Sequence, residues 1–187
     1  MFPLTLLPLP GELVPLHIFE PRYKQLLEDA ETTDLSFGIF CSHECNEQKL
    51  GALMKLESVI KRYPGGESDI ILRCLDIFSM DKLYRTYKSK LYPGGDTRSW
   101  QIDAQAMPGV ELYELFLVFQ EKRKINRHFT AFTLYQIATE LSLDLFDRYK
   151  FITLPETKRE IFLITQLKFQ LHIITQEEKS KHVYHLN

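Results

Sequence analysis

The most informative stretch of the sequence is Leu7-Pro8-Leu9-Pro10-Gly11-Glu12-Leu13-Val14-Pro15-Leu16-His17-Ile18-Phe19-Glu20-Pro21-Arg22-Tyr23. Each proline fixes φ and removes a backbone donor, and the residue before it is pushed toward extended geometry. The chain is therefore expected to enter as a strand over residues 2–7 and then to cross a surface in a fixed extended path. That path ends at Pro21, which suits the first turn of a helix.

A helix is predicted directly after Pro21, because apolar side chains recur there at helical spacing, at Tyr23, Leu26, Leu27 and Ala30. The rest of the segment 1–107 has the alternating, turn-bounded pattern of strands. We expect these strands over residues 36–41, 51–63, 68–80, 83–92 and 98–106.

One tetrapeptide occurs twice, as Tyr63-Pro64-Gly65-Gly66 and as Tyr92-Pro93-Gly94-Gly95. Proline presets the first turn position and glycine supplies positive φ, so both copies are predicted to be hairpin turns. A phosphate-binding glycine loop would need a helix N-terminus next, and both copies lead into strand patterns instead. The sequence therefore favours turns over phosphate sites.

The segment 108–187 has helical periodicity. Thr153 and Glu156 have the spacing of a capping box before the last and clearest helix, and the polar tail 177–187 is expected to fray. Apolar residues mark two earlier helices and the last one at Leu112, Leu115, Phe116, Phe119, Leu134, Ile137, Ala138, Leu141, Ile161, Ile164, Leu167, Leu171 and Ile174. The stretch 112–119 is apolar nearly all round, which indicates a buried helix or, alternatively, a patch that grips a partner.

Composition limits the function classes. The 187 residues carry a net charge of −2, with 44% hydrophobic and 26% charged residues, as in an ordinary globular protein. This balance predicts no strong attraction to nucleic acid or to an anionic membrane. No apolar run reaches the ~20 residues that span a bilayer, and no secretory signal is apparent. Because the three cysteines do not form a disulfide framework, a reducing, cytoplasmic location is expected.

Three parts of the chain together resemble one known family. The run 15–23, preceded by Leu7-Pro8 and Pro10-Gly11, resembles the opening motif of the Lon protease N-terminal domain, also called the Lon substrate-binding domain. The run 71–78 is similar to a strand of the hairpin of that family, with Cys74 where many members have glycine. The run 154–160 is similar to the entry of its long helix, with Arg159 where glutamine is common.

This resemblance implies an α+β fold. The segment 1–107 would be a PUA-like β pseudo-barrel lobe with one embedded helix, and 108–187 a helical lobe. The implied function is non-catalytic recognition of unfolded or partner polypeptide, with a separate ATP-dependent protease as a further partner. The alternative is an RNA-binding PUA-like module, because the same fold occurs in RNA-modifying proteins.

Catalytic motifs and cofactor motifs are missing from the sequence. There is no Gly-x-x-x-x-Gly-Lys-Ser/Thr loop, no Gly-x-Ser-x-Gly elbow and no His-Glu-x-x-His pair. We therefore expect a stand-alone substrate-binding domain that is not an enzyme and that uses no cofactor.

The candidate peptide-binding residues are His17, Phe19, Glu20, Arg22 and Tyr23. The same residues can instead pin the crossing from strand to helix, and His17 with Glu20 could be an acid–base pair. Two further groups have ordinary readings that we prefer. The first is Cys41, His43 and Cys45, which share one side of a strand but provide too few ligands for structural zinc, so no metal is expected. The second is the basic run Lys122, Arg123, Lys124, Arg127 and His128, which suits a helix C-terminus.

Overall fold

The computed structural model describes residues 1–125 and 131–184 of the chain. The chain packs as two units. Unit 1 is Met1–Ile102 together with Asp144–Tyr149, and unit 2 is Asp103–Leu143 together with the chain from Lys150 onward. The sequence placed the division at residue 107, whereas the units divide after Ile102, and a short piece from the helical half packs with unit 1.

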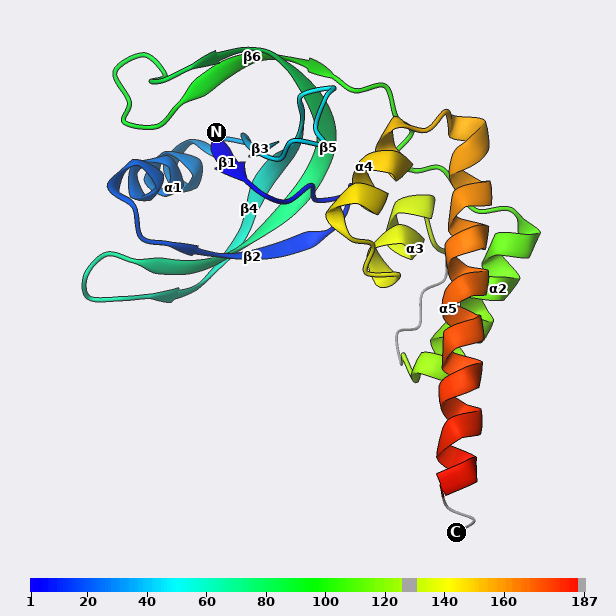
Figure 1. The fold of residues 1–187 in the computed structure, drawn as a ribbon. Helices are drawn as coiled ribbons and strands as arrows, with labels where there is room; N and C mark the ends of the chain where they lie inside the picture. The colour runs from blue at the N-terminus through cyan, green and yellow to red at the C-terminus, as the bar shows by residue number, and fades with distance from the viewer. Residues whose placement is uncertain (126–130, 185–187) are drawn as a thin grey trace. The chain divides into compact units, whose positions relative to one another are not determined.

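Unit 1 is built on a mixed six-stranded sheet (Figure 1). The strands pair in the order β1-β3-β4-β5-β2, and β6 pairs with β5 beyond this path. Only the β1–β3 pair is parallel. The strands are β1 Phe2–Leu4, β2 Leu13–Ile18, β3 Phe37–Cys41, β4 Leu50–Arg62, β5 Ser68–Tyr84 and β6 Gly94–Ser99.

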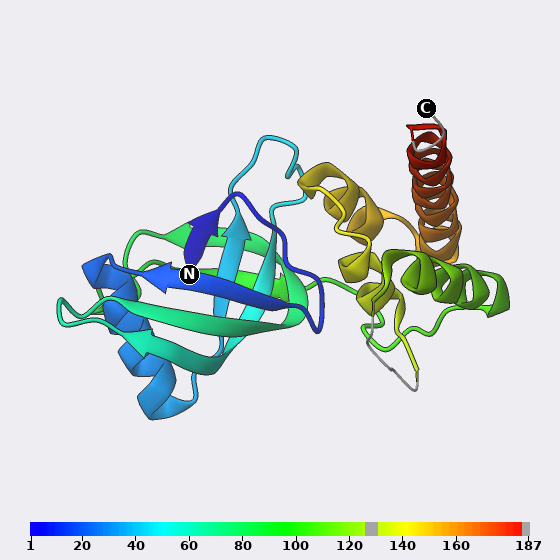
Figure 2. The same ribbon diagram turned by 90° about the horizontal axis from the view of Figure 1, so that it is seen from below.

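The sheet curves because its two long strands are bulged. Register shifts interrupt the β4–β5 pairing at three places and the β5–β6 pairing at one. Each bulge adds a residue on one strand and increases the local twist. The curvature is visible from two directions in Figures 1 and 2. Among the described residues the strand order has β1 and β2 as its ends, so the sheet is open and the expected closed pseudo-barrel is not confirmed.

Helix α1, Pro21–Thr33, begins at the expected proline and buries the expected face of Tyr23, Leu26, Leu27 and Ala30. It is held between the β4–β5 turn and the β5–β6 loop (Figure 1). Lys24 Nζ donates to the Gly65 carbonyl at 2.8 Å, and the Asp29 carboxylate accepts from Lys90 at 2.8 Å and from Tyr92 at 2.7 Å. The embedded helix is therefore tied to both loops by polar contacts.

Two expected strands differ from the observed ones. The segment 83–92 was predicted to be a strand, but β5 continues to Tyr84 and a loop follows it. The segment 98–106 was also predicted as a strand, but β6 is earlier, at Gly94–Ser99. Conversely β2, which pairs with β5 from Leu13 to Ile18, lies where only an extended path was expected. A ladder partner is a tertiary property, so spacing alone could not assign these pairings.

The two copies of the repeated tetrapeptide adopt different structures. Gly66 has φ +84°, the Gly66 N–H donates to the Tyr63 carbonyl, and the first copy is the predicted β4–β5 hairpin turn. In the second copy Gly94 and Gly95 already belong to β6 and pair with β5. The prediction was right for the first copy and wrong for the second.

Unit 2 contains α2 Val110–Arg123, α3 Leu134–Glu140, the end of α4 Leu145–Thr153, and α5 Glu156–Tyr184. Thr133 caps α3 in a capping box with Gln136. Thr153 is the last residue of α4, where its hydroxyl donates to the Lys150 carbonyl, and α5 begins at Glu156. The helix α5 continues through most of the tail that was expected to fray.

A buried arginine joins three helices of unit 2. Arg159 on α5 is 5% exposed. Its Nη1 donates to Tyr135 Oη on α3 at 3.1 Å, and its Nη2 donates to the Ile152 carbonyl on α4 at 3.1 Å. A cation beside the C-terminal carbonyls of α4 is favoured by the helix dipole. The arginine that replaces the expected glutamine therefore has a structural role here.

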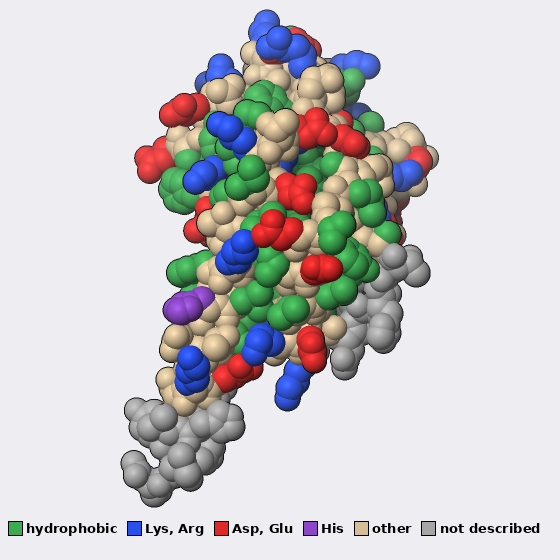
Figure 3. All heavy atoms as spheres, turned by 90° about the vertical axis from the view of Figure 1, so that its right-hand side faces the viewer, with side chains coloured by type: hydrophobic (Ala, Val, Ile, Leu, Met, Phe, Trp, Pro, Cys, Tyr) green, Lys and Arg blue, Asp and Glu red, His purple; other side chains and the backbone are tan. Residues whose placement is uncertain are grey.

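The helices α2 and α5 pack together and leave part of each surface apolar. Leu112, Phe116 and Phe119 are buried, whereas Leu117 and Val118 of the same helix are exposed. Figure 3 views the side that carries these helices and shows hydrophobic side chains between charged ones. Interhelical ion pairs join Lys168 to Glu111 and Lys122 to Glu178. One face of the apolar stretch 112–119 is therefore buried as expected, and the other face is exposed.

The basic run lies partly at the expected helix end. Lys122 and Arg123 are in the last turn of α2, and Lys124 is its C-cap residue with φ 54°. Arg127 and His128 lie outside the described residues.

Candidate functional site

One face of the sheet of unit 1 is directed to solvent and carries apolar groups. We call it the outer face and define it by strand register as Leu13, Pro15 and His17 of β2 with Asp69, Ile71, Arg73 and Leu75 of β5. Cross-strand partners lie on the same side of a sheet, and alternate residues of a strand share a side. The intervening β5 residues, such as Ile70, Leu72 and Cys74, are buried.

Most of the outer face away from His17 is apolar. Leu13 is 49% exposed and Leu75 is 40% exposed, and the pair Pro15–Ile71 lies on the side of Leu13 toward His17. A two-point ion pair lies within this strip, because Arg73 stands between Ile71 and Leu75 on β5, with its Nε 2.9 Å and its Nη2 2.7 Å from the Glu57 carboxylate. A strip of this kind can contact apolar side chains of a ligand without first losing hydrogen bonds.

One end of the outer face is a polar and aromatic cluster. His17 Nδ1 is 2.6 Å from Asp69 Oδ1, and Tyr63 Oη donates to Asp69 Oδ2 at 2.7 Å. The His17 ring lies 6.0 Å from the Phe19 ring in a stacked arrangement and 5.7 Å from the Tyr63 ring, edge-on. The cluster therefore presents three ring surfaces around one carboxylate.

The electrostatics of this cluster favour an ionised Asp69. Hydrogen bonds from His17 and Tyr63 hold the pKa of the Asp69 carboxyl below its usual range. The hydrogen bond to the same carboxylate is the first cause of a raised pKa for Tyr63. The cluster thus joins one imidazole, one phenol and one exposed phenyl ring beside an ionised carboxylate.

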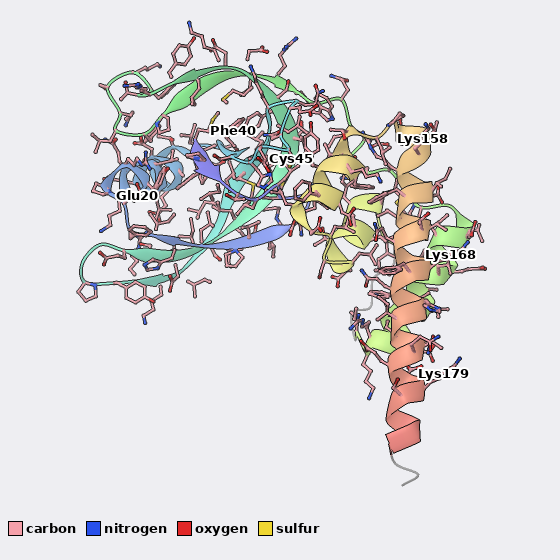
Figure 4. The ribbon with its side chains drawn as sticks, viewed as in Figure 1. Glu20, Phe40, Cys45, Lys158, Lys168 and Lys179 are labelled. Carbon is pink, nitrogen blue, oxygen red and sulfur yellow. The ribbon has the colours of Figure 1, made fainter. Side chains whose placement is uncertain are left out.

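The five predicted site residues divide between surface and core. Phe19 is 59% exposed and His17 is exposed beside it. Glu20 lies just before α1 (Figure 4) and forms an ion pair with Arg22 at 2.8 Å. Tyr23 is 7% exposed, with its ring 4.0 Å from that of Phe2 and the Arg22 guanidinium over it at 4.5 Å. The surface thus brings His17 and Phe19 together, while Tyr23 belongs to the packed core.

The structure adds residues that sequence reasoning missed. Asp69 and Tyr63 complete the aromatic cluster, and Leu13, Ile71 and Leu75 supply the apolar strip. A signal for Ile71 and Leu75 was present, because β5 alternates between buried and accessible residues from Ser68 to Leu75. The pairing of His17 with Asp69 across 52 positions required the register of β2 on β5.

A small pocket in unit 1 lies beside the start of β2. It has a volume of about 260 Å³ and is lined by Thr5, Leu6, Leu7, Pro8, Glu12, Val14, Leu145 and Arg148. Its charged residues, Glu12 and Arg148, bond to each other in two places, and Arg148 also donates to the Leu7 carbonyl at 3.3 Å. The charged groups at this pocket therefore bond to each other and to the backbone, and these bonds stabilise the fold.

The cysteine and histidine group lies at the end of β3. Cys41 is buried, and burial raises the pKa of its thiol to about 11. His43 Nδ1 accepts from the Cys45 N–H at 3.2 Å, and Cys45 is labelled in Figure 4. Across residues 1–125 and 131–180, no group of three or more His, Cys, Asp or Glu side chains is arranged to hold a metal ion.

Two edge strands of the sheet are poorly suited to accept an added strand. The end strands of the order, β1 and β2, contain Pro3 and Pro15 respectively. Proline lacks the N–H that a new strand would need, and proteins use it to block edges. The strand β6, which pairs only with β5, contains no proline.

Comparison with solved structures identifies the fold. A Lon N-terminal domain protein from Xanthomonas campestris superposes with a TM-score of 0.64 at 22% identity, covering 91% of this chain and 95% of that one. The N-terminal domain of a Mycobacterium avium complex Lon protease superposes with a TM-score of 0.59 at 15% identity, covering 90% and 96%. This chain has the fold of a Lon N-terminal domain. The expected resemblance is confirmed at the level of the fold.

The other comparisons add no closer relative. No protein-family model matches the chain, and no curated protein matches it. Among the helices within the described parts, none is long and apolar enough to cross a bilayer. The likeness to other proteins is therefore a likeness of fold, to the Lon N-terminal domain.

Proposed function

We propose that this protein is a non-catalytic module that binds unfolded or partner polypeptide on the outer face of unit 1. The observation that carries the proposal is the apolar strip of Leu13, Pro15, Ile71 and Leu75 next to the exposed Phe19. These side chains remain accessible to solvent although the intervening residues of β5, Ile70, Leu72 and Cys74, are fully buried. The fold is that of domains from Lon proteins, and this likeness supports a binding module.

The physical basis of binding is desolvation of apolar surface together with polar anchoring. Apolar side chains of an unfolded chain would lie along the strip, where burial contributes ~25 cal/mol per Å². The Asp69 carboxylate at one end and the Arg73–Glu57 pair within the strip offer hydrogen-bonding groups to the ligand backbone. Affinity should be modest and broad in specificity, because the strip contains no deep pocket.

The wider setting follows from the same proposal. A separate ATP-dependent protease is the partner that would use such a module, and unit 1 would be an open variant of the PUA-like pseudo-barrel. Cys41, Cys45 and Cys74 are free thiols, which fits a cytoplasmic location. The absence of a catalytic motif in the sequence supports a role without enzymatic activity of its own.

The decisive experiment compares two exposed phenylalanines. Phe19 is 59% exposed on unit 1 and Phe169 is 62% exposed on α5. Binding of a permanently unfolded model protein is measured for the wild type, Phe19→Ala and Phe169→Ala. We expect Phe19→Ala to weaken binding about five- to tenfold, as for a residue near an interface centre, and Phe169→Ala to leave it unchanged.

A salt titration completes the test. Binding through the apolar strip should change little between low and physiological salt, because screening acts on charges. The double variant Leu13→Ser with Leu75→Ser should weaken binding further than Phe19→Ala alone. Equal loss in Phe169→Ala, or unchanged binding in the double variant, would place recognition elsewhere and reject the outer face.

A further inference from the structure

The end of β5 and the loop after it are strongly basic and rich in tyrosine. The segment reads Lys82-Leu83-Tyr84-Arg85-Thr86-Tyr87-Lys88-Ser89-Lys90-Leu91-Tyr92 and contains four cations and no acidic residue. The whole chain has a net charge of −2, so this segment departs from the average of the molecule. It follows the outer-face residues of β5 along the chain and joins β5 to β6 (Figure 1).

Two tyrosine rings in this segment form a fixed platform. Tyr84 is 37% exposed, and its hydroxyl donates to Asp96 Oδ2 at 2.6 Å. Tyr87 is 44% exposed, and its ring packs so closely on Gly94 that a Cβ there would lie 2.6 Å from Cδ2 of the ring. Tyr84 and Gly94 are also cross-strand partners. Both rings are therefore held by residues of β6, Tyr84 through the Asp96 carboxylate and Tyr87 against Gly94.

The platform is maintained by a buried neighbour. Tyr92 is 4% exposed, and its ring lies 6.4 Å from that of Tyr87 with an interplanar angle of 14°. The Tyr87 N–H donates to the Tyr92 carbonyl at 2.9 Å. Tyr92 is itself fixed by its hydrogen bond to Asp29 of α1. The exposed ring of Tyr87 thus rests on a residue anchored in the core.

Three cations beside the platform have no carboxylate partner within the described parts of the chain: Lys82, Arg85 and Lys88. Lys90 differs, since it is paired with Asp29. Lys82 Nζ lies 5.1 Å from the Tyr84 ring centre, and Lys88 Nζ lies 5.2 Å from the Tyr87 ring centre. These two ammonium groups are placed over ring faces, where an anion and a flat ring can be contacted together.

We propose that this basic tyrosine platform binds a single strand of nucleic acid, with phosphates on Lys82, Arg85 and Lys88 and bases stacked on Tyr84 and Tyr87. Grooves that bind single strands combine cations along the backbone with aromatic rings that stack on successive bases. The site is separate from the outer face and independent of the proposed polypeptide binding. Single-stranded nucleic acid would be a second class of ligand for this chain, which the net charge of −2 alone would not predict.

Two other anionic ligands fit the observations less well. An acidic peptide would use the cations, but it would have no use for two exposed rings held flat. An anionic membrane would use the cations and the exposed Leu83 and Leu91, but it would have no use for two rings held in place, and vesicles are therefore an arm of the test. The Tyr84 hydroxyl is held by Asp96 and the Tyr87 ring lies against Gly94, so the two rings offer a face and not a protruding tip. A base needs only such a face.

The test measures binding of a fluorescent single strand of about twelve nucleotides to the full chain over a range of salt concentrations. With three phosphate contacts the logarithm of affinity should fall with the logarithm of salt with a slope of about −2. The triple variant Lys82→Gln, Arg85→Gln, Lys88→Gln should abolish most of this slope and bind at least tenfold more weakly. Tyr87→Ala should weaken binding about tenfold with the slope unchanged, whereas Tyr87→Phe should bind like the wild type.

A matched control alters the same charge elsewhere. Lys158, Lys168 and Lys179 are exposed along α5 (Figure 4), and replacing all three by glutamine changes the net charge by the same amount. This control should bind the strand as the wild type does. Equal loss in both triple variants would indicate attraction to overall charge and overturn the platform.

Competition distinguishes the ligand classes. A duplex of the same sequence should compete poorly, because its base faces are covered. Poly-glutamate or anionic vesicles that bind as tightly as the strand, without loss in Tyr87→Ala, would overturn the nucleic-acid assignment. Unchanged binding of unfolded protein by the triple variant would show that the two sites act separately, so failure of one proposal can be told from failure of the other.

Discussion

Arg148 and Glu12 lie 136 positions apart in the sequence and form a two-point ion pair, with Nη1 2.6 Å from Oε2 and Nη2 3.0 Å from Oε1. Glu12 Oε2 also accepts from the Leu9 N–H at 2.9 Å. The two side chains are only 17% and 15% exposed. The pair fastens the beginning of α4 to the proline-rich path before β2, which explains why Asp144–Tyr149 packs with unit 1.

We predict that Arg148→Met destabilises unit 1 by about 2–4 kcal/mol, because removing one member leaves the Glu12 carboxylate half-buried without its cation. The double variant Arg148→Met with Glu12→Gln should recover part of this loss. Urea unfolding followed by the fluorescence of Trp100, the single tryptophan, reports on unit 1. A cost below about 0.5 kcal/mol for the single variant would mean that the pair behaves like an exposed one.

Two neighbouring aromatic residues should respond in opposite ways to truncation. Tyr23→Ala removes a ring that is 7% exposed and should destabilise unit 1 by about 3–5 kcal/mol. Phe19→Ala removes a ring that is 59% exposed and should change stability by less than about 1 kcal/mol. Thermal unfolding of both variants checks this. A large loss for Phe19→Ala would mean that its effect on ligand binding reflects unfolding.

The first Pro-Gly-Gly turn offers a prediction with an internal control. Gly66 has φ +84°, so Gly66→Ala should destabilise unit 1 by about 1–2 kcal/mol through backbone strain. At Gly65 an added Cβ meets only the end of the Glu67 side chain, which can move, so Gly65→Ala should be nearly neutral. The two variants are compared by chemical denaturation. Equal costs would contradict a turn that depends on the left-handed residue.

The carboxyl group of Asp29 should make stability fall in acid. Hydrogen bonds from Lys90 and then Tyr92 hold the pKa of Asp29 below its ordinary value. A depressed carboxyl pKa contributes stability that is present above the unfolded pKa, about 4, and is lost as pH falls through the folded pKa. The wild type should therefore lose more stability than Asp29→Asn as the pH is lowered from about 5 to about 2.5. Parallel curves for the two proteins in acid denaturation would reject this role.

Much of the candidate site could not be read from spacing. The motif around His17 and Phe19 contains two side chains that the structure places together on one surface, but Tyr23 in the same motif is core. A helix beginning at Pro21 turns its residues in different directions, and which of them meets Phe2 depends on the position of β1. Asp69 and Tyr63 became partners of His17 only through strand register.

Local sequence sufficed to predict the helix that begins at Pro21 with its buried stripe and the strand alternation of β5. Backbone restriction by proline and the periodicity of apolar residues act within a few residues, so they can be read directly. Distant contacts determined that the first Tyr-Pro-Gly-Gly forms a turn while Gly94-Gly95 continues a strand, that β2 joins β5, and that Arg148 binds Glu12. These outcomes depend on partners far away in the chain, and identical tetrapeptides therefore differ wherever their neighbours in space differ.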